Sequence, residues 1–168
     1  MLRNQHKESN QPSAGNWCVR KGLTIQKQNI MREPYTVAYW GIFLIISTVV
    51  IQGIIAAASK ASQTGAIPGK IDESLSHASF VFRSNRTFMN SLENFPAMIG
   101  ASFLAVLVGA NVFWTGVLIL VFAMSRIIHM ILYYLISTEK NPSPRSYFFI
   151  AGLVANIALL ALCGVALA

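Results

Sequence analysis

Apolar residues fall in long blocks along this chain, and polar segments separate them. The first block covers residues 35–59, between Glu33 and Lys60. The last covers residues 146–168 and follows a short polar connection that contains two prolines. At about 1.5 Å of rise per residue, each block is long enough to cross a bilayer as a helix. The pattern therefore predicts membrane-spanning helices at both ends of the apolar region.

The middle of the chain holds two further helices. No formal charge occurs from residue 94 to 125, which is too long a stretch for one helix. Gly109-Ala110-Asn111 indicates a turn near its centre. We therefore predict a second helix over about 86–108 and a third over about 112–137. Pro96 should kink the second helix or mark a local irregularity in it.

The polar segments define the domain organisation. Residues 1–33 are polar, basic and without periodicity, which predicts a disordered tail. Met31 is an alternative start, in which case the tail is not native. Residues 60–85 form a long polar loop, and residues 34–168 form one integral membrane domain. The expected fold is an all-α, multi-pass bundle of four transmembrane helices with both ends on one side.

Composition narrows the class of protein. Charged residues make up 11% of the chain, against about 25% in soluble domains. The net charge is +7, but the basic residues lie in the tail and loops, without interleaved aromatics. We therefore expect membrane lipid rather than nucleic acid as a partner. The cysteines, Cys18 and Cys163, have no metal-ligand spacing, so no metal site is predicted. Charge alone does not decide the membrane orientation.

Two polar patterns lie within the predicted second and third helices. Arg86, Asn90 and Glu93 are spaced i, i+4 and i+7 and share one helix face. Arg126 shares the next helix with His129 and Tyr133 at i+3 and i+7. Charges at membrane depth are costly and usually functional.

The two helices run antiparallel, so Glu93 and Arg126 should reach similar depth and offset each other's charge. A purely structural ion pair between them is the alternative. For His129 the alternative is an ordinary hydrogen-bonded core residue, and for Tyr133 it is an aromatic-belt position.

Arg145 and Ser146 complete the expected site. Arg145 enters from the loop before the fourth helix, and Ser146 is a candidate N-terminal cap. The helix N-terminus adds positive potential there. Arg86 and Arg145 could each be ordinary interfacial charges instead. Three arginines and one glutamate at one face predict a site for an anion that also carries a cationic group.

These motifs resemble a known family. Arg86-Thr-Phe-Met-Asn90-Ser-Leu-Glu93-Asn-Phe-Pro96 is similar to the signature of the membrane-associated proteins in eicosanoid and glutathione metabolism (MAPEG). Arg126-Ile-Ile-His129-Met-Ile-Leu-Tyr133 resembles the third-helix pattern of that family, and Pro144-Arg145-Ser146 resembles the start of its fourth helix. The resemblance covers about residues 35–168.

The resemblance implies a homotrimer that binds glutathione between neighbouring protomers near the cytoplasmic face. It implies that Arg86 and Asn90 anchor glutathione, and that Glu93 pairs with its amine or orders nearby arginines. Arg145 would stabilise the thiolate, with Ser146 as an alternative donor. By the same resemblance the pocket is lined from the third helix by Arg126, His129 and Tyr133.

The expected activity is that of a microsomal glutathione transferase-like enzyme. It would activate glutathione for attack on lipophilic electrophiles or lipid hydroperoxides. One alternative is a non-catalytic lipid-binding or scaffolding protein of the same fold. A small transporter is a further alternative, but no internal repeat is evident.

Overall fold

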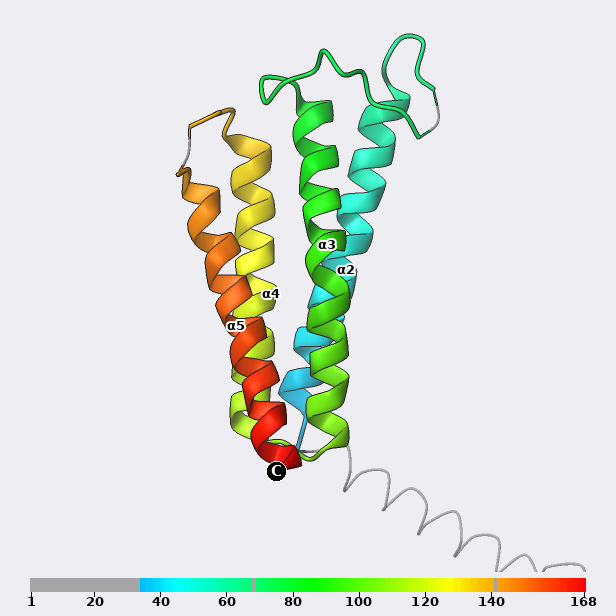
Figure 1. Ribbon diagram of the computed structural model, residues 1–168. Coiled ribbons are helices and arrows are strands. Elements are labelled where there is room, and N and C mark those ends of the chain that lie inside the picture. Colours follow the sequence, from blue (N-terminus) through cyan, green and yellow to red (C-terminus); the bar gives the residue numbers. More distant parts are fainter. Residues whose placement is uncertain (1–33, 68, 141) are drawn as a thin grey trace, which may run out of the picture. The chain divides into compact units, whose positions relative to one another are not determined.

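The computed structural model describes residues 34–67, 69–140 and 142–168. The predicted disordered tail, residues 1–33, lies outside the described residues. The described part of the chain forms four helices, α2 (Thr36–Ala61), α3 (Phe80–Leu107), α4 (Val112–Leu135) and α5 (Pro144–Leu167). They alternate in direction, so the α2–α3 loop and the α4–α5 connection lie at the same end (Figure 1). The all-α expectation is confirmed for these residues.

Three of these helices, α2, α4 and α5, are long and apolar enough to cross a membrane. Helix α3 is as long, but Arg83, Arg86 and Glu93 fall in its first half, and it is not among the three. It nevertheless packs against α2, α4 and α5 as a full member of the bundle. Two of these charges, Arg86 and Glu93, belong to the polar pattern identified in the sequence.

The predicted turn between the second and third helices is confirmed. Gly109 has a φ of 67°, a left-handed conformation that glycine adopts without steric cost. The Ala110 N–H donates to the Ala105 carbonyl, which closes the end of α3. Asn111 then caps α4, because its side chain accepts a 3.1 Å hydrogen bond from the Trp114 N–H.

Two predicted helix starts were wrong. Helix α3 begins at Phe80 rather than at residue 86, so the polar loop ends at Ser79. The extra turn forms because Val81 and Ser84 are buried on one face, and the Ser84 hydroxyl lies 2.7 Å from the Ser59 hydroxyl of α2. A helix start cannot be placed from a polar motif when the turn before it packs against a neighbouring helix.

For α5 the apolar span was predicted from residue 146, but the helix begins two residues earlier, at Pro144, a residue type that suits a helix start, and Ser143 is its N-cap. Proline suits the first helical position because its fixed φ is helical and it lacks an N–H that would be unpaired there. Arg145 therefore belongs to the first turn of α5, not to the preceding loop. Similarly, α4 ends at Leu135, slightly before the predicted residue 137.

Glycines allow α2 and α4 to approach closely. A Cβ on Gly41 would lie 2.6 Å from the Ile119 side chain, and one on Gly116 would lie 3.1 Å from Val37. Such small residues are typical where membrane helices pack, because lipid supplies no hydrophobic force between them.

Pro96 lies within α3, which continues through it to Leu107.

Candidate functional site

A cavity of about 510 Å³ opens at the end of the bundle that carries the α2–α3 loop and the α4–α5 connection. This volume falls within the range of about 300–1,000 Å³ typical of small-molecule sites. Five of the residues predicted from the sequence line it, namely Asn90, His129, Tyr133, Arg145 and Ser146. The other lining residues were not predicted, and they are His77, Glu139, Lys140, Ser143, Phe149 and Ile150. Three helices and two connecting segments therefore converge on one space.

Arg145 is the central cation of this cavity. Its side chain is only 6% exposed. The guanidinium donates to the Thr138 carbonyl at 2.9 Å and to the Ser143 hydroxyl at 3.2 Å. It also lies over the Tyr133 ring, 4.0 Å from the centroid, a cation–π geometry that holds the plane of the guanidinium. Nη1 is buried and has no hydrogen-bond partner within the described chain.

The ring of Tyr133 connects three groups of the site. Besides the Arg145 guanidinium, His129 lies 5.4 Å from it and His77 lies 5.8 Å from it, between ring centroids. His129 is 3% exposed, and its Nδ1 has no partner among the residues described. The prediction that His129 and Tyr133 face the pocket is thus supported by their position. The alternative of a hydrogen-bonded core histidine finds no partner for Nδ1 in this part of the structure.

Ser146 lines the cavity, but it does not cap α5 as expected. Ser143 is the N-cap, and Ser146 stands three positions later. The Ser143 N–H donates to the Ser146 hydroxyl at 3.4 Å, and the Ser146 N–H donates to the Ser143 carbonyl at 2.9 Å. The first of these two hydrogen bonds is the one that the side chain at the third helical position makes in a capping box. Together they fix the first turn of α5 and with it the backbone that carries Arg145.

Arg126 does not line the cavity. Its side chain is 4% exposed and donates 2.8 Å hydrogen bonds to the Asn90 Oδ1 and the Ser91 hydroxyl. The alternative, a structural ion pair between Arg126 and Glu93, is not formed among the described residues. Glu93 still attracts Arg126 electrostatically. The expected charge offset between Glu93 and Arg126 is thus supported, and only the direct ion pair is missing, because Asn90 and Ser91 lie on the face of α3 toward α4 whereas Glu93 is exposed.

Arg86 and Glu93 therefore stand outside the cavity, exposed on the surface of α3. Helical spacing correctly grouped Asn90 with them on one broad face, but only Asn90 points inward to both the cavity and Arg126. Within this chain, the polar pattern of α3 is divided between an inner and an outer surface.

His77 reaches the cavity because an arginine holds its segment. Arg83 donates to the His77 carbonyl at 2.7 Å and to the Ala78 carbonyl at 2.8 Å. The Ser137 hydroxyl donates to the same His77 carbonyl at 2.9 Å. The sequence carried no spacing signal for this arrangement, because His77 stands in an aperiodic loop. Only the fold brings the loop against the end of α4.

The electrostatics of the cavity favour an anion. Burial lowers the pKa of His77 below its ordinary value of 6.5, and the nearby positive charge of Arg145 lowers that pKa further. His77 is therefore neutral at neutral pH and can donate or accept one hydrogen bond. The unpartnered Arg145 Nη1 is a fixed cationic donor. An anionic group of a small ligand would fit these donors.

Comparison with known proteins places the chain in a family. Residues 37–165 match the MAPEG family, so the chain belongs to that family, as the motifs predicted. The chain matches no individual curated protein and no solved structure.

Membership of this family has two consequences. The family includes glutathione transferases and peroxidases as well as non-catalytic members. Together with the three apolar helices, it identifies the chain as an integral membrane protein.

Proposed function

We propose that this protein is a glutathione-dependent transferase or peroxidase that acts on lipophilic electrophiles or lipid hydroperoxides. The observation that carries the proposal is the buried guanidinium of Arg145. It is held by Thr138 and Ser143, stacked on Tyr133, and presents an unpartnered N–H within a residue set that lines a cavity of about 510 Å³. Burial of such a donor without a ligand is costly.

The residues of the cavity suit a glutathione-sized anion. Glutathione, when bound, would supply the sulfur nucleophile of the reaction. Free thiols have a pKa of about 8.5, so a nearby cation is needed to favour the anion at neutral pH. Arg145 would supply that charge, and Ser146 could donate a hydrogen bond to the same group. Lowering a thiol pKa by about two units corresponds to about 2.7 kcal/mol.

The other wall of the cavity is apolar. Phe149 and Ile150 of α5 line it, and Ile150 is 53% exposed on the surface of the protomer. A lipophilic substrate dissolved in the bilayer could therefore approach from the side, between helices, without crossing the aqueous phase. Asn90, His129 and Tyr133 would orient the polar end of the ligands against this apolar wall.

The proposed assembly is a homotrimer with each glutathione between neighbouring protomers, and the site faces the cytoplasm. The exposed positions of Arg86 and Glu93 support it. A carboxylate exposed toward lipid in the middle of a helix is unfavourable, and a neighbouring protomer would cover it. Arg86 and Glu93 would then contact glutathione across the boundary. The mass of the detergent-solubilised oligomer, with detergent subtracted, tests the assembly.

The function is tested by equilibrium binding of glutathione to detergent-purified protein, read together with the ultraviolet absorbance of the thiolate. We expect binding with a thiolate signal. Arg145→Ala should abolish that signal and lower turnover about 100-fold, the effect typical of losing one charge-stabilising donor. Lys140→Gln, which removes an exposed cation from the same cavity, should change binding by less than about threefold.

Each outcome has a distinct meaning. Binding without thiolate would retain the pocket and remove Arg145 as the activating residue. Unchanged turnover in Arg145→Ala, in a sample with unaltered thermal stability, would likewise show that Arg145 is not the activating residue. Failure of the intact oligomer to bind glutathione would overturn the enzymatic proposal and favour a non-catalytic member of the family.

A further inference from the structure

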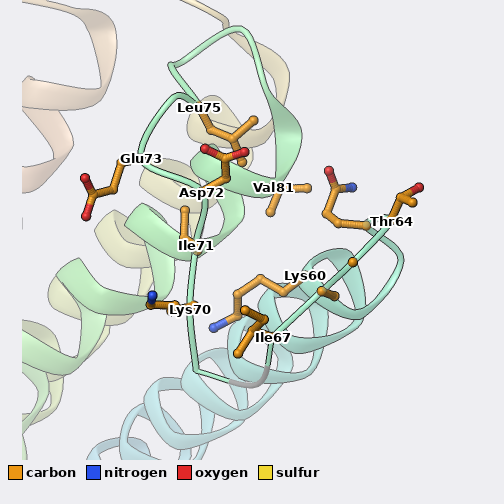
Figure 2. Close-up of a pocket in the computed structure, with 12 residues that line it drawn as sticks. Lys60, Thr64, Ile67, Lys70, Ile71, Asp72, Glu73, Leu75 and Val81 are labelled. Carbon is orange, nitrogen blue, oxygen red and sulfur yellow. The ribbon is translucent and has the colours of Figure 1, made fainter.

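A second hollow lies under the α2–α3 loop, apart from the residues that line the cavity of Arg145. It has a volume of about 340 Å³ and is bounded by the last turn of α2, the loop and the first turn of α3 (Figure 2). Four charged side chains line it, Lys60, Lys70, Asp72 and Glu73. Apolar side chains line it as well, Ile67, Ile71, Leu75 and Val81. The hollow is therefore amphipathic.

The charges of this hollow are separated by sign. In Figure 2 the Lys60 and Lys70 amines lie on the side toward α2, and the Asp72 and Glu73 carboxylates lie on the opposite side. No ion pair joins either lysine to either carboxylate in the part of the chain described. Lys60 donates only a long hydrogen bond, 3.4 Å, to the Asn85 Oδ1. Two cationic and two anionic groups thus remain available to a ligand with both charges.

Asp72 is held in its charged form. The Ser74 hydroxyl and N–H donate to Asp72 Oδ1 at 2.7 Å and 2.9 Å. These hydrogen bonds, the hydroxyl contributing most, hold the pKa of the Asp72 carboxyl below its ordinary value. The same contacts fix the orientation of the carboxylate while leaving its second oxygen free to accept. Asp72 is therefore a defined acceptor rather than a mobile surface charge.

An apolar groove continues from this hollow along α2. It has a volume of about 430 Å³ and is lined by Ala57, Lys60, Ala61, Ala66, Ile67 and Gly69. Lys60, Ala66 and Ile67 line both spaces, so the charged hollow and the groove adjoin. Ile67 is 61% exposed. A ligand that fills both spaces must join a charged end to an apolar end.

The position of α2 places these spaces at the membrane boundary. Helix α2 is long and apolar enough to span a bilayer and ends at Ala61, with Lys60 in its last turn. Lysine at the end of a span lies at the level of the lipid headgroups. The hollow is therefore at headgroup level, and the groove beside Ala57 leads toward the hydrocarbon region.

We propose that this loop pocket binds a zwitterionic phospholipid with a primary amine in its headgroup. The phosphate would contact Lys60 and Lys70, and the ammonium would contact Asp72 and Glu73. One acyl chain would follow the groove past Ile67 and Ala57. A headgroup of this kind matches both signs of charge, whereas an anionic lipid without an amine would face two uncompensated carboxylates.

The test is native mass spectrometry of delipidated, detergent-purified protein with added phosphatidylethanolamine or phosphatidylglycerol. We expect phosphatidylethanolamine to be retained about fivefold more strongly, as one charge contact at a membrane surface would give. Lys70→Gln should weaken retention of both lipids about fivefold. Asp72→Asn combined with Glu73→Gln should weaken only phosphatidylethanolamine, and Ile67→Asp should weaken both.

Lys70→Arg is the matched control and should retain wild-type binding, because it keeps the charge. Equal retention of the two lipids in the wild type would overturn the proposal, as would retention unaffected by these variants. Lipid bound elsewhere on the bundle would give retention that these variants do not change. Glutathione binding, measured on the same samples, should not change. The two proposals can therefore fail independently.

Discussion

Two arginines are buried in this bundle, and their surroundings differ. Arg126, in α4, donates to Asn90 and Ser91, and the space beside it is only about 10 Å³, room for about one water. Arg145, in α5, lines a cavity of about 510 Å³. Both retain one nitrogen without a described partner. Burial of a charge therefore does not identify a ligand site, and the volume of the space that each arginine lines distinguishes the two.

The difference in their surroundings also indicates that the two arginines have different roles. Arg126 joins α4 to α3 and holds Asn90, so we interpret it as a positioning residue. Arg145 is itself held by the backbone of the α4–α5 connection and by Tyr133. Arg145 also lines the cavity that we propose binds a ligand. Four experiments can break or sharpen this comparison.

The largest effect on stability is expected at Arg126. Arg126→Lys keeps the buried charge but cannot donate to Asn90 and Ser91 with the geometry of a guanidinium. We expect a loss of about 1–2 kcal/mol in the free energy of unfolding in detergent, since hydrogen bonds within membrane proteins contribute modestly. Arg126→Met removes the charge as well and should cost less. Loss of glutathione binding at unchanged stability would instead place Arg126 in the ligand site.

Asn90 should affect both regions, because it accepts from Arg126 and lines the cavity. Asn90→Ala is expected to lower stability by about 1 kcal/mol and glutathione affinity about threefold. Asn90→Asp gives Arg126 a counter-charge, so it should preserve stability and still weaken binding of an anion. Unfolding and binding measured on the same samples check this. If Asn90→Ala changed neither quantity, the link between the two arginines would be refuted.

Arg83 holds the segment that carries His77 to the cavity. Arg83→Gln removes the donors to the His77 and Ala78 carbonyls. We expect hydrogen exchange in residues 74–79 to accelerate about fivefold, equivalent to about 1 kcal/mol, with little change in global unfolding. Arg86→Gln, an exposed arginine on the next turn of α3, should leave this exchange unaltered. An equal acceleration in both variants would contradict the specific role of Arg83.

The smallest effect concerns pH and His77. Its pKa in the folded protein lies below 6.5, through burial first and then Arg145. Above about pH 6.5 both folded and unfolded states are neutral. Below it the unfolded state binds the proton more readily, so stability falls as pH falls. The other charges acting on His77 are those of Glu139, Arg86 and Arg83.

His77→Gln should therefore flatten the decline in melting temperature between about pH 6.5 and 5. Arg145→Ala should flatten it in part, because it removes one cause of the lowered pKa. Melting temperature followed across this range measures both effects. An unchanged slope in His77→Gln would show that His77 does not titrate differently on folding.

Much of the architecture followed from local pattern. Long apolar blocks predicted four helices, and Gly109-Ala110-Asn111 predicted the turn between α3 and α4, because a left-handed glycine and an N-capping asparagine are local requirements. The starts of α3 and α5 were misplaced, since packing of Val81 and the N-cap of Ser143 decided them. The first start depends on neighbours in space, and the second depends on which of two serines three positions apart becomes the N-cap.

The sequence by itself determined the family, the helical class and the polar residues worth following, because their spacing repeats with the helix. Only the tertiary structure decided how these residues divide. In the folded protein Arg126 donates to Asn90, and Arg86 and Glu93 are exposed. His77, which belongs to a loop, lines the same cavity as Arg145. The physical reason is that helical spacing fixes a shared face, whereas the partner across that face depends on how the helices pack.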